Sequence, residues 1–535
     1  MDAQQDVTND AAHGHRASWY GFMSVVFVAF ALFAAGSPQI ENPGEQTRLE
    51  LAASLGLHGS VALDPVIDTY GIPFDRAERD GKSYADKAPG LSFVGAPVTA
   101  SLGRLLPRAP GSSMPDYWPL RHLLVLLLVA VPATLFPFVA LRRYSGLDVR
   151  RRVAVAMIFA LCTPLFTYGV GFLSHVPAGL LAVLSFVLLV RPGREDPIPS
   201  AGVAFLGGLA LAGAVTMEYP TALFGVVLVP TMLLRRVPVR ALAGFALGCA
   251  VGIVPCLIYH QFAFGAPWAT GYSFKSDSWH AIVHETGLLG VSLPSVERLW
   301  GVFGSARRGM FFYCPLLLLF PVGLWRMEKA RRYSSLPFVA LTIVYAFFAG
   351  GFVDWMAGWS AAARHLIPWM LLLVFPVASG IEYVSNQPRV RWLLVPLVAL
   401  SLVGALLSLS FSPWFPEHYA SPFGQLVLPM LAQGFAAPTL FASADLAARP
   451  FALAGTVLFV TAATVYAVST LVQTDKPRVL VPAAMVAVIA LQIALLWTAA
   501  SPLTHEEQKV QSQVLERLGY DQPNRESRGV HVAPW

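Results

Sequence analysis

The residues of this sequence that are best suited to chemistry lie in one polar stretch near its beginning. They are Glu41, Glu45, Arg48, Tyr84, Asp86 and Lys87. A carboxylate can take a proton from a hydroxyl group, and lysine and arginine side chains bind phosphate and other anions. A run of charge is also typical of a solvated surface, so the residue types alone leave both a functional site and an ordinary surface open.

The remainder of the chain is too apolar for a soluble domain. Of its 535 residues, 56% are hydrophobic and 13% are charged, against about 25% charged in soluble domains. The mean hydropathy of +0.59 agrees. The net charge of +6 comes from Lys and Arg in short loops between apolar runs, which favours membrane topology over nucleic-acid binding. The four cysteines show neither disulfide nor zinc-ligand spacing.

Apolar stretches of about 17–25 residues predict transmembrane helices. There are thirteen candidates: 18–36, 118–141, 153–172, 175–190, 201–217, 219–234, 241–262, 309–325, 335–353, 365–383, 392–412, 450–473 and 479–500. We expect the first to be an uncleaved anchor, although 34–36 resembles a signal-peptide cleavage site. The predicted fold class is therefore an all-α polytopic membrane protein with about 13 transmembrane helices.

The distribution of basic residues predicts the orientation. With residues 1–17 as a cytoplasmic tail, six consecutive cytoplasmic loops hold Lys or Arg, and they are 142–152, 191–194, 235–240, 326–332, 389–391 and 476–478. The short turns on the other side contain a single base, Arg364. This asymmetry follows the positive-inside rule.

The orientation leaves four segments outside: a large first loop at 37–117, further loops at 263–308 and 413–449, and a tail at 501–535. In the first loop, 47–57 has helical spacing and predicts an amphipathic helix at the interface. Asp80-Gly81 predicts a tight turn, and Pro89-Gly90 precedes a second interfacial helix over 91–106. Thr504 opens a capping box, which predicts a surface helix in the tail.

Two motifs in the first loop carry a resemblance to a known family. Glu45-x-x-Arg48 and Tyr84-x-x-Lys87-Ala88-Pro89 resemble the first-loop signature of GT-C glycosyltransferases of the family 39 type, which include protein O-mannosyltransferases and lipid A aminoarabinose transferases. The signature of the latter reads Asp-Glu-x-Arg-Tyr, followed later by Tyr-x-x-Lys-Pro-Pro. Here Glu45 stands at the leading Asp, and Lys-Pro-Pro becomes Lys87-Ala88-Pro89.

The resemblance implies a membrane glycosyltransferase with a GT-C-like fold and a polyprenyl-phosphate-linked sugar donor. The acceptor would be an extracytoplasmic glycan, lipid or protein, and a single displacement would invert the anomeric carbon. Glu45 would be the general base, with Glu41 as the fallback, and Lys87, Arg48 and Arg364 would bind the donor phosphate. These roles fit the chemistry, since glycosyl transfer needs a base near the acceptor and cations at the departing phosphate.

Further polar residues on the outer side are candidate substrate contacts. They are Tyr84, Asp86, His175, Glu218, Tyr219, Arg307, Arg308, Asp354 and His365. A structural role stays open for several of them. Glu218 could be the ion-pair partner of an arginine, His175 could be a hydrogen-bonded core histidine, and Arg307 and Arg308 could extend to the membrane surface.

Other classes of function remain to be weighed. The first loop has no Asp-x-Asp pair and the chain has no His-rich spacing, so we expect no metal ion and no other cofactor. A glycine-rich phosphate loop is also absent from the sequence. A transporter or flippase of lipid-linked sugars would place charge near the midplane within a repeat. A polysaccharide polymerase or ligase would share the same side and lipid.

Overall fold

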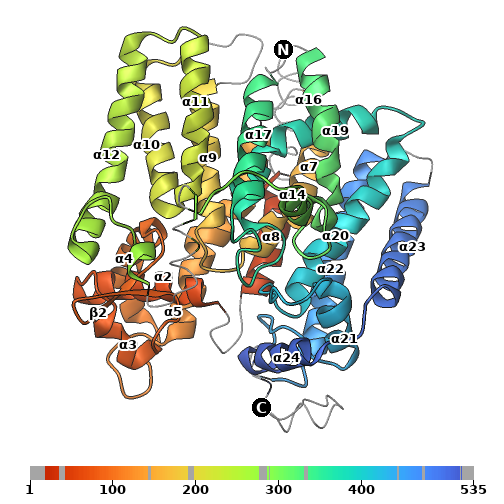
Figure 1. The fold of residues 1–535 in the computed structure, drawn as a ribbon. Coiled ribbons are helices and arrows are strands. Elements are labelled where there is room, and N and C mark those ends of the chain that lie inside the picture. Colours follow the sequence, from red (N-terminus) through yellow and green to blue (C-terminus); the bar gives the residue numbers. More distant parts are fainter. Residues whose placement is uncertain are drawn as a thin grey trace, which may run out of the picture.

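The computed structural model is mostly helical (Figure 1). It describes residues 19–34, 42–142, 146–190, 198–275, 283, 286–287, 290–329, 335–442, 445–472, 476–518 and 520. Long helices run roughly vertically in Figure 1, and a smaller subdomain with α2, α3, α4 and β2 lies at their lower left.

Each of the thirteen apolar segments contains helix. The helices of the first seven segments are Trp19–Ala34, α5 (Tyr117–Val125) continuing through η3 (Leu126–Ala130) into α6 (Val131–Leu141), α7 (Val149–Leu161) with α8 (Pro164–Tyr168), α9 (His175–Val190), α10 (Ala201–Met217), η4 (Tyr219–Ala222) with α11 (Leu223–Leu234), and α12 (Val239–Phe264). The helices of the last six are α15 (Met310–Tyr313), η6 (Pro315–Leu319) and α16 (Phe320–Lys329), then α17 (Leu336–Gly351), η7 (Arg364–Leu366) with α18 (Ile367–Leu372) and α19 (Val374–Ser385), η8 (Arg391–Leu393) with α20 (Leu394–Ser410), α22 (Arg449–Leu471), and α23 (Pro477–Thr498).

Five helices in the described part of the chain are long and apolar enough to cross a membrane by themselves. A sixth is added if the bent pair 364–372 and 374–385, which turns by 59°, is one span. The multi-pass architecture is thus supported, whereas thirteen full spans are not confirmed. The third and eighth segments are interrupted, and a proline follows each interruption, at Pro164 and Pro315.

Small residues let neighbouring helices approach closely. A Cβ on Gly208 of α10 would lie 2.1 Å from the carbonyl oxygen of Phe245 in α12. A Cβ on Gly248 of α12 would lie equally close to the carbonyl oxygen of Phe205 in α10. The two helices therefore meet backbone to backbone, as is common in membrane interiors.

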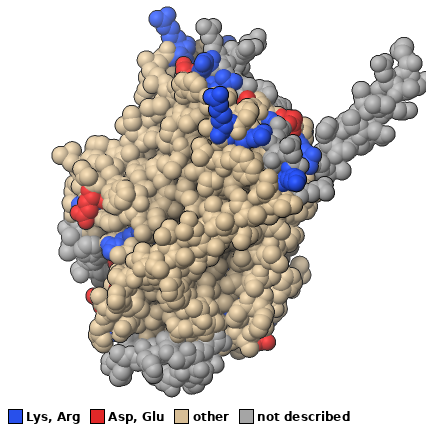
Figure 2. All heavy atoms as spheres, turned by 90° about the vertical axis from the view of Figure 1, so that its right-hand side faces the viewer, with Lys and Arg blue, Asp and Glu red and all other residues tan. Residues whose placement is uncertain are grey.

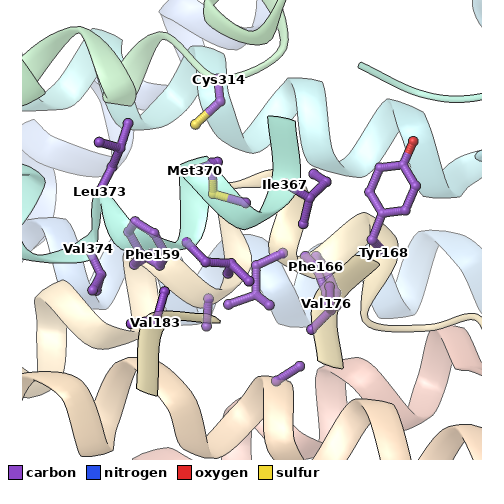
Figure 3. Close-up of a cluster of buried hydrophobic side chains, with 14 of the residues drawn as sticks. Phe159, Phe166, Tyr168, Val176, Val183, Cys314, Ile367, Met370, Leu373 and Val374 are labelled. Carbon is purple, nitrogen blue, oxygen red and sulfur yellow. The ribbon is translucent and has the colours of Figure 1, made fainter. Parts of the chain in front are cut away.

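The largest apolar core joins α7, α8, α9 and α18 (Figure 3). Phe159, Phe166, Val176, Ile367 and Met370 are all fully buried within it. Because such side chains pack at crystal-like density, this core fixes the ends of α8 and α9 firmly. Those ends carry several of the polar residues described below.

The first outer loop folds into a compact subdomain. It contains α2 (Pro43–Ala53), η1 (Ser54–His58), α3 (Asp64–Tyr70), the antiparallel hairpin of β1 (Arg76–Arg79) and β2 (Lys82–Ala85), α4 (Gly90–Leu102) and η2 (Gly103–Leu105). The predicted turn is confirmed, since Asp80 and Gly81 both have positive φ, as a two-residue hairpin turn requires. The second predicted helix is confirmed as α4.

The first predicted helix of this loop differs from expectation. Its α-helical part begins at Pro43, four residues earlier than predicted, and every residue from Gly44 to Ala53 is buried. The prediction of an amphipathic surface helix is therefore wrong, because α2 is enclosed by α4 and its neighbours on all sides. Periodicity cannot reveal such burial when the helix also carries charge.

The turn between α11 and α12, which holds Arg235 and Arg236, lies at the opposite end of the molecule from the first-loop subdomain (Figure 1). On the face shown in Figure 2, Lys and Arg side chains gather at the upper end, above a wide area with almost no charge. This separation matches the predicted alternation of loops.

The other segments between the long helices contain η5 (Gly271–Phe274), α14 (Val296–Phe303), η9 (Phe423–Val427) and α21 (Leu428–Ala432). The tail contains α24 (His505–Arg517), and its predicted capping box is confirmed between Thr504 and Glu507. Val510, Val514, Leu515 and Leu518 are buried in a second apolar cluster, as their spacing indicated.

Candidate functional site

The helix α2 places Glu45 against a partner from a distant segment. Asn42 caps the helix by accepting a hydrogen bond from the backbone N–H of Glu45. The Glu45 carboxylate accepts bonds at Oε1 from Arg121 Nε (2.9 Å) and the backbone N–H of Phe172 (2.6 Å). Its Oε2 accepts a further bond from Arg121 Nη2 at 3.3 Å. Glu45 is thus held rigidly, in a pair with an arginine that the sequence did not single out.

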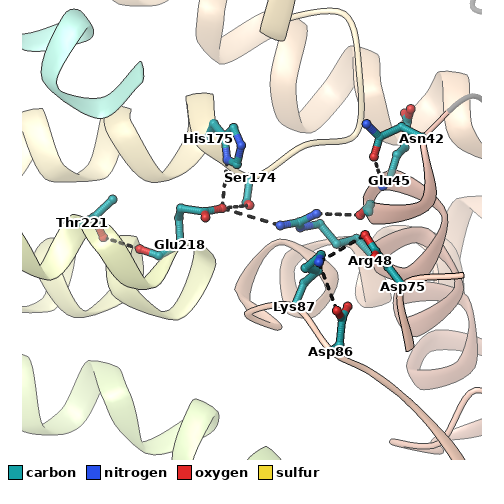
Figure 4. Close-up of polar contacts among 11 residues, drawn as sticks. Asn42, Glu45, Arg48, Asp75, Asp86, Lys87, Ser174, His175, Glu218 and Thr221 are labelled. Carbon is teal, nitrogen blue, oxygen red and sulfur yellow. Dashed lines mark hydrogen bonds and ion pairs between the residues drawn. The ribbon is translucent and has the colours of Figure 1, made fainter. Parts of the chain in front are cut away.

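One helical turn later, Arg48 points to a different carboxylate (Figure 4). Its Nη2 lies 3.6 Å from Glu218 Oε2, and its Nη1 donates to the carbonyl of Gly44 at 2.6 Å. The same Glu218 oxygen accepts from the Ser174 hydroxyl (2.6 Å) and lies 2.9 Å from His175 Nδ1. Of the two interpretations left open for Glu218, the structure shows the ion pair, with Arg48 as the partner, and a substrate contact stays a prediction.

A third set of charges lies beside Arg48. Lys87 Nζ lies 3.0 Å from Asp86 Oδ2 and 3.2 Å from Asp75 Oδ2, and Lys275 Nζ lies 2.9 Å from Asp86 Oδ2 and 3.3 Å from Asp75 Oδ1. Burial raises the pKa of the Asp75 carboxyl, but Lys87 and Lys275 outweigh it, so its pKa lies below the usual range. For Lys87, burial lowers the pKa of the ammonium group, but Asp75 and Asp86 raise it by more. The pKa of Lys87 therefore lies above its usual value. Both groups therefore stay charged at neutral pH.

Glycines bring these segments together. A Cβ on Gly90 would lie 2.7 Å from the backbone nitrogen of Met217, so the start of α4 touches the end of α10 beside Glu218. A Cβ on Gly271 would lie 2.5 Å from the Cα of Asp86, which brings Lys275 to the cluster. The Ser92 hydroxyl donates to the carbonyl of Arg48 at 2.7 Å and ties α4 to α2.

Arg364 and His365 complete this arrangement from η7. The positive charge of Arg364 acts on Asp75, Lys87 and His175, and the imidazoles of His175 and His365 lie 6.2 Å apart. The Nε atoms of Arg48 and Arg364, both ring nitrogens of His365, and His175 Nε2 are buried without hydrogen-bond partners in the described part of the chain. Buried donors are normally satisfied, and each orphan costs about 1–3 kcal/mol.

We use the name charged cluster for the residues of these ion pairs together with Arg364 and His365. They are Glu45, Arg48, Asp75, Asp86, Lys87, Arg121, His175, Glu218, Lys275, Arg364 and His365. Five of these side chains are cations and four are carboxylates, apart from the histidines, so the cluster has an excess positive charge. It can therefore accommodate an anion.

Some predicted residues lie in other surroundings. The ring of Tyr84 is buried in a small apolar cluster with Tyr259 and Phe264. The hydroxyl of Tyr219 lies 2.9 Å from His260 Nε2. Asp354 lies in the half-buried turn before Ala357. Glu41 lies outside the described residues.

The two arginines at 307 and 308 differ from each other. The Arg308 guanidinium is fully buried and donates to the carbonyls of Arg307, Met356, Gly358 and Phe415 at 2.8–3.1 Å. Arg307 Nη1 contacts the sulfur of Met356 at 3.6 Å. We call the first arrangement the Arg308 clamp, because it joins three loop segments through their backbones.

Sequence reasoning missed Arg121, Asp75, Lys275 and Ser174. Arg121 lies four residues after Tyr117, the first residue of a long apolar span, where charge is costly and by default functional or paired, so its position was a usable signal. Asp75 and Lys275 lie 200 positions apart and look like ordinary loop residues.

In the described residues, no group of three or more His, Cys, Asp or Glu side chains could hold a metal ion. Metal independence stays a prediction.

Comparison with known proteins identifies the fold. No protein-family model matches the chain, and no curated protein matches its sequence. Among solved structures, the chain is similar to ArnT from Cupriavidus metallidurans bound to undecaprenyl phosphate, with a TM-score of 0.50, 17% identity, and coverage of 96% of this chain and 79% of that chain. The apo state of the same ArnT matches with a TM-score of 0.47, 18% identity, and coverage of 95% and 78%. The predicted GT-C-like fold is thereby confirmed.

Proposed function

We propose that this chain is an integral membrane glycosyltransferase that transfers a sugar from a polyprenyl-phosphate-linked donor to an extracytoplasmic acceptor. The observation that carries the proposal is the charged cluster, with its excess of cations and its buried nitrogens that lack partners. The fold it shares with an ArnT that binds undecaprenyl phosphate supports the choice of anion.

The donor phosphate would be bound by Lys87, Arg48 and Arg364. Lys87 has 14% of its side chain exposed, whereas Lys275 has 2%, so Lys87 is the more accessible of the two lysines. Arg48 and Arg364 each offer at least one N–H without a partner in the described chain. Cations arranged before the reaction favour the charge that develops on the departing phosphate.

Glu45 would be the general base. A carboxylate has about four lone-pair positions, and three are used by Arg121 and the Phe172 backbone. The remaining position is on Oε2. Space beside it is provided by Gly171, whose Cβ would lie 3.8 Å from both Glu45 oxygens and 3.5 Å from Trp414. An acceptor hydroxyl could approach the carboxylate there.

The proposed reaction is one displacement. The acceptor oxygen forms a bond to the anomeric carbon as the bond from that carbon to the phosphate oxygen breaks. The hydroxyl proton passes to Glu45, and the prenyl phosphate leaves with the electron pair, stabilised by Lys87, Arg48 and Arg364. Attack from the opposite face inverts the anomeric carbon. In this proposal the N-terminus is cytoplasmic and the site lies at the extracytoplasmic face of the membrane, where an amphiphilic donor can reach it from the lipid.

The decisive experiment is the Glu45→Gln variant in a deletion strain, with envelope glycans analysed by mass spectrometry. We expect transfer to fall by about 10²–10⁴-fold, the contribution of a positioned base. Because Arg121 would lose its carboxylate partner, we also expect lower thermal stability. Glu50→Gln is the matched control, since it removes a buried carboxyl from the same helix.

Two results would contradict the proposal. Full transfer in Glu45→Gln would remove Glu45 from the base role. Accumulation of intact sugar donor on the inner leaflet of the deletion strain would instead identify a flippase.

A further inference from the structure

A polar cavity lies apart from the charged cluster, between α21, the end of α23 and α24. Its volume is about 420 Å³, within the range of about 300–1,000 Å³ for small-molecule sites. The side chains that matter to its chemistry are Gln425, Gln433, Trp497, Ser501, Gln508 and Gln511. These elements lie at the same end of the molecule as α2 and β2 (Figure 1).

One wall of this cavity, which we call the glutamine cleft, is fixed by hydrogen bonds. Gln425 Oε1 accepts from the backbone N–H of Ser421 at 2.8 Å, and its Nε2 donates to Glu507 Oε1 at 3.2 Å and to the Ser501 hydroxyl at 3.4 Å. Glu507 is itself held by the capping box of α24. The wall is therefore already in place before any ligand binds.

The other three glutamines keep their amides available. In the described chain, the side chains of Gln433, Gln508 and Gln511 form no hydrogen bond, although Gln511 is buried and Gln433 Oε1 is fully covered. An amide both donates and accepts, so three of them suit a ligand with many hydroxyl groups. None of the described lining residues is charged. The ligand is thus neutral.

Trp497 adds an apolar surface, because its side chain lines the cleft and is 50% exposed. An indole face packs well against the C–H side of a sugar ring, while the amides hydrogen-bond the hydroxyls. The described elements around the cleft are helices, and the lining residues 500–503 between α23 and α24 are irregular and belong to no strand. They offer no strand edge to an extended peptide.

The cleft is linked to the charged cluster by a row of aromatic rings. The His175 and Tyr168 rings lie 5.8 Å apart, and Tyr168 and Trp414 lie 6.1 Å apart. Phe415 follows Trp414 in the chain and packs 5.7 Å from Phe423, which precedes the cleft residues Gly424 and Gln425. These rings are buried, so the row joins the two regions through the interior of the protein and not along a surface.

We propose that the glutamine cleft binds a neutral oligosaccharide. This inference goes beyond the proposed function, since it concerns binding away from the charged cluster and holds whether or not the chain transfers a sugar.

The test is saturation-transfer NMR on the full chain in lipid nanodiscs, without glycoside detergents. The probes are maltotriose, mannotriose and triacetylchitotriose, with tri-galacturonate as the charged comparison. We expect saturation transfer to at least one neutral trisaccharide and none to the charged one. Sugar transfer by the Glu45→Gln variant is measured in a separate assay. Failure of the binding proposal therefore does not affect the proposal of glycosyl transfer, and the reverse is also true.

Two variants locate the binding. Trp497→Ala and Gln433→Ala should each weaken the binding of the neutral trisaccharide by about tenfold, which corresponds to about 1.4 kcal/mol of binding free energy. Trp268→Ala, at an indole that is 82% exposed in another segment, is the matched control and should bind as the parent does.

Absence of binding by every neutral trisaccharide would overturn the proposal. So would unchanged affinity in both cleft variants, or binding only of tri-galacturonate. Circular dichroism and thermal melting of each variant confirm that the fold is intact, because both side chains lie partly exposed at the ends of their helices.

Discussion

Arg308 and Arg364 lie directly before the apolar segments 309–325 and 365–383, at the ends predicted to be extracytoplasmic. Their surroundings in the structure differ completely. Arg308 gives its donors to four backbone carbonyls and is fully buried. Arg364 is close enough to act on Lys87 and Asp75, and its Nε has no partner in the described chain. The first arrangement stabilises the fold, whereas the second leaves a buried donor without a partner, which costs stability. For these two arginines, the partners distinguish the roles where the position before an apolar segment does not.

The sharpest way to break this comparison is to neutralise each arginine with the same replacement. Arg308→Met should remove four hydrogen bonds made by a buried charged group and destabilise the protein by a few kcal/mol, although the carbonyls of Arg307, Met356 and Phe415 keep second donors from Tyr313 and Ser360. Arg364→Met should leave the melting temperature unchanged and weaken the binding of undecaprenyl phosphate by about 10- to 100-fold. Thermal melting and native mass spectrometry of the purified proteins measure both effects. Equal loss of stability in the two variants would contradict the distinction.

Lys87→Met sharpens the same contrast within the charged cluster. Lys275 still balances part of the charge of Asp75 and Asp86, so we expect the fold to persist. Binding of undecaprenyl phosphate should weaken by about tenfold, the effect of one charge-assisted hydrogen bond. Titration in nanodiscs provides the measurement. Unaltered affinity would remove Lys87 from the phosphate site.

Gly171→Ala is a smaller change aimed at the space beside Glu45. The new methyl group would make ordinary contacts at 3.5–3.8 Å, so the fold should tolerate it. It would fill the proposed approach of the acceptor, and we expect several-fold slower transfer with unchanged binding of undecaprenyl phosphate. Rates from the glycan assay test this. Wild-type rates would place the acceptor elsewhere.

Glu50→Gln should change stability without changing transfer. Burial raises the pKa of Glu50 to about 8, only partly opposed by the hydrogen bond from Gln46, so the folded state holds a proton that the unfolded state releases above about 4.5. The stability from this proton is full below pH 4.5 and is lost as pH rises to about 8. At pH 7 the free energy of unfolding is lower than below pH 4.5 by on the order of 3 kcal/mol. Melting curves of Glu50→Gln should show a flatter pH profile and a higher midpoint at pH 8.

Local patterns were sufficient for much of the fold. Thirteen apolar segments, the turn at Asp80-Gly81 and the capping box at Thr504 each depend on neighbouring residues, and the structure contains all of them. The family resemblance grouped Glu45, Arg48 and Lys87 in one site, and their roles stay predictions because each side chain pairs with a different carboxylate or arginine. The surface position of α2 was predicted wrongly, because burial depends on α4 and its neighbours and not on the spacing within the helix.

By itself, the sequence determined where the chain is apolar, which ends of its helices carry charge, and which short motif is suited to bind a phosphate. Those properties act over a few residues or over the thickness of a bilayer. Only the tertiary structure decided that Glu45 pairs with Arg121, that Glu218 pairs with Arg48, and that Lys275 joins Lys87. Such pairs form between segments far apart in the chain, where packing sets the distances and electrostatic energy depends on distance and burial.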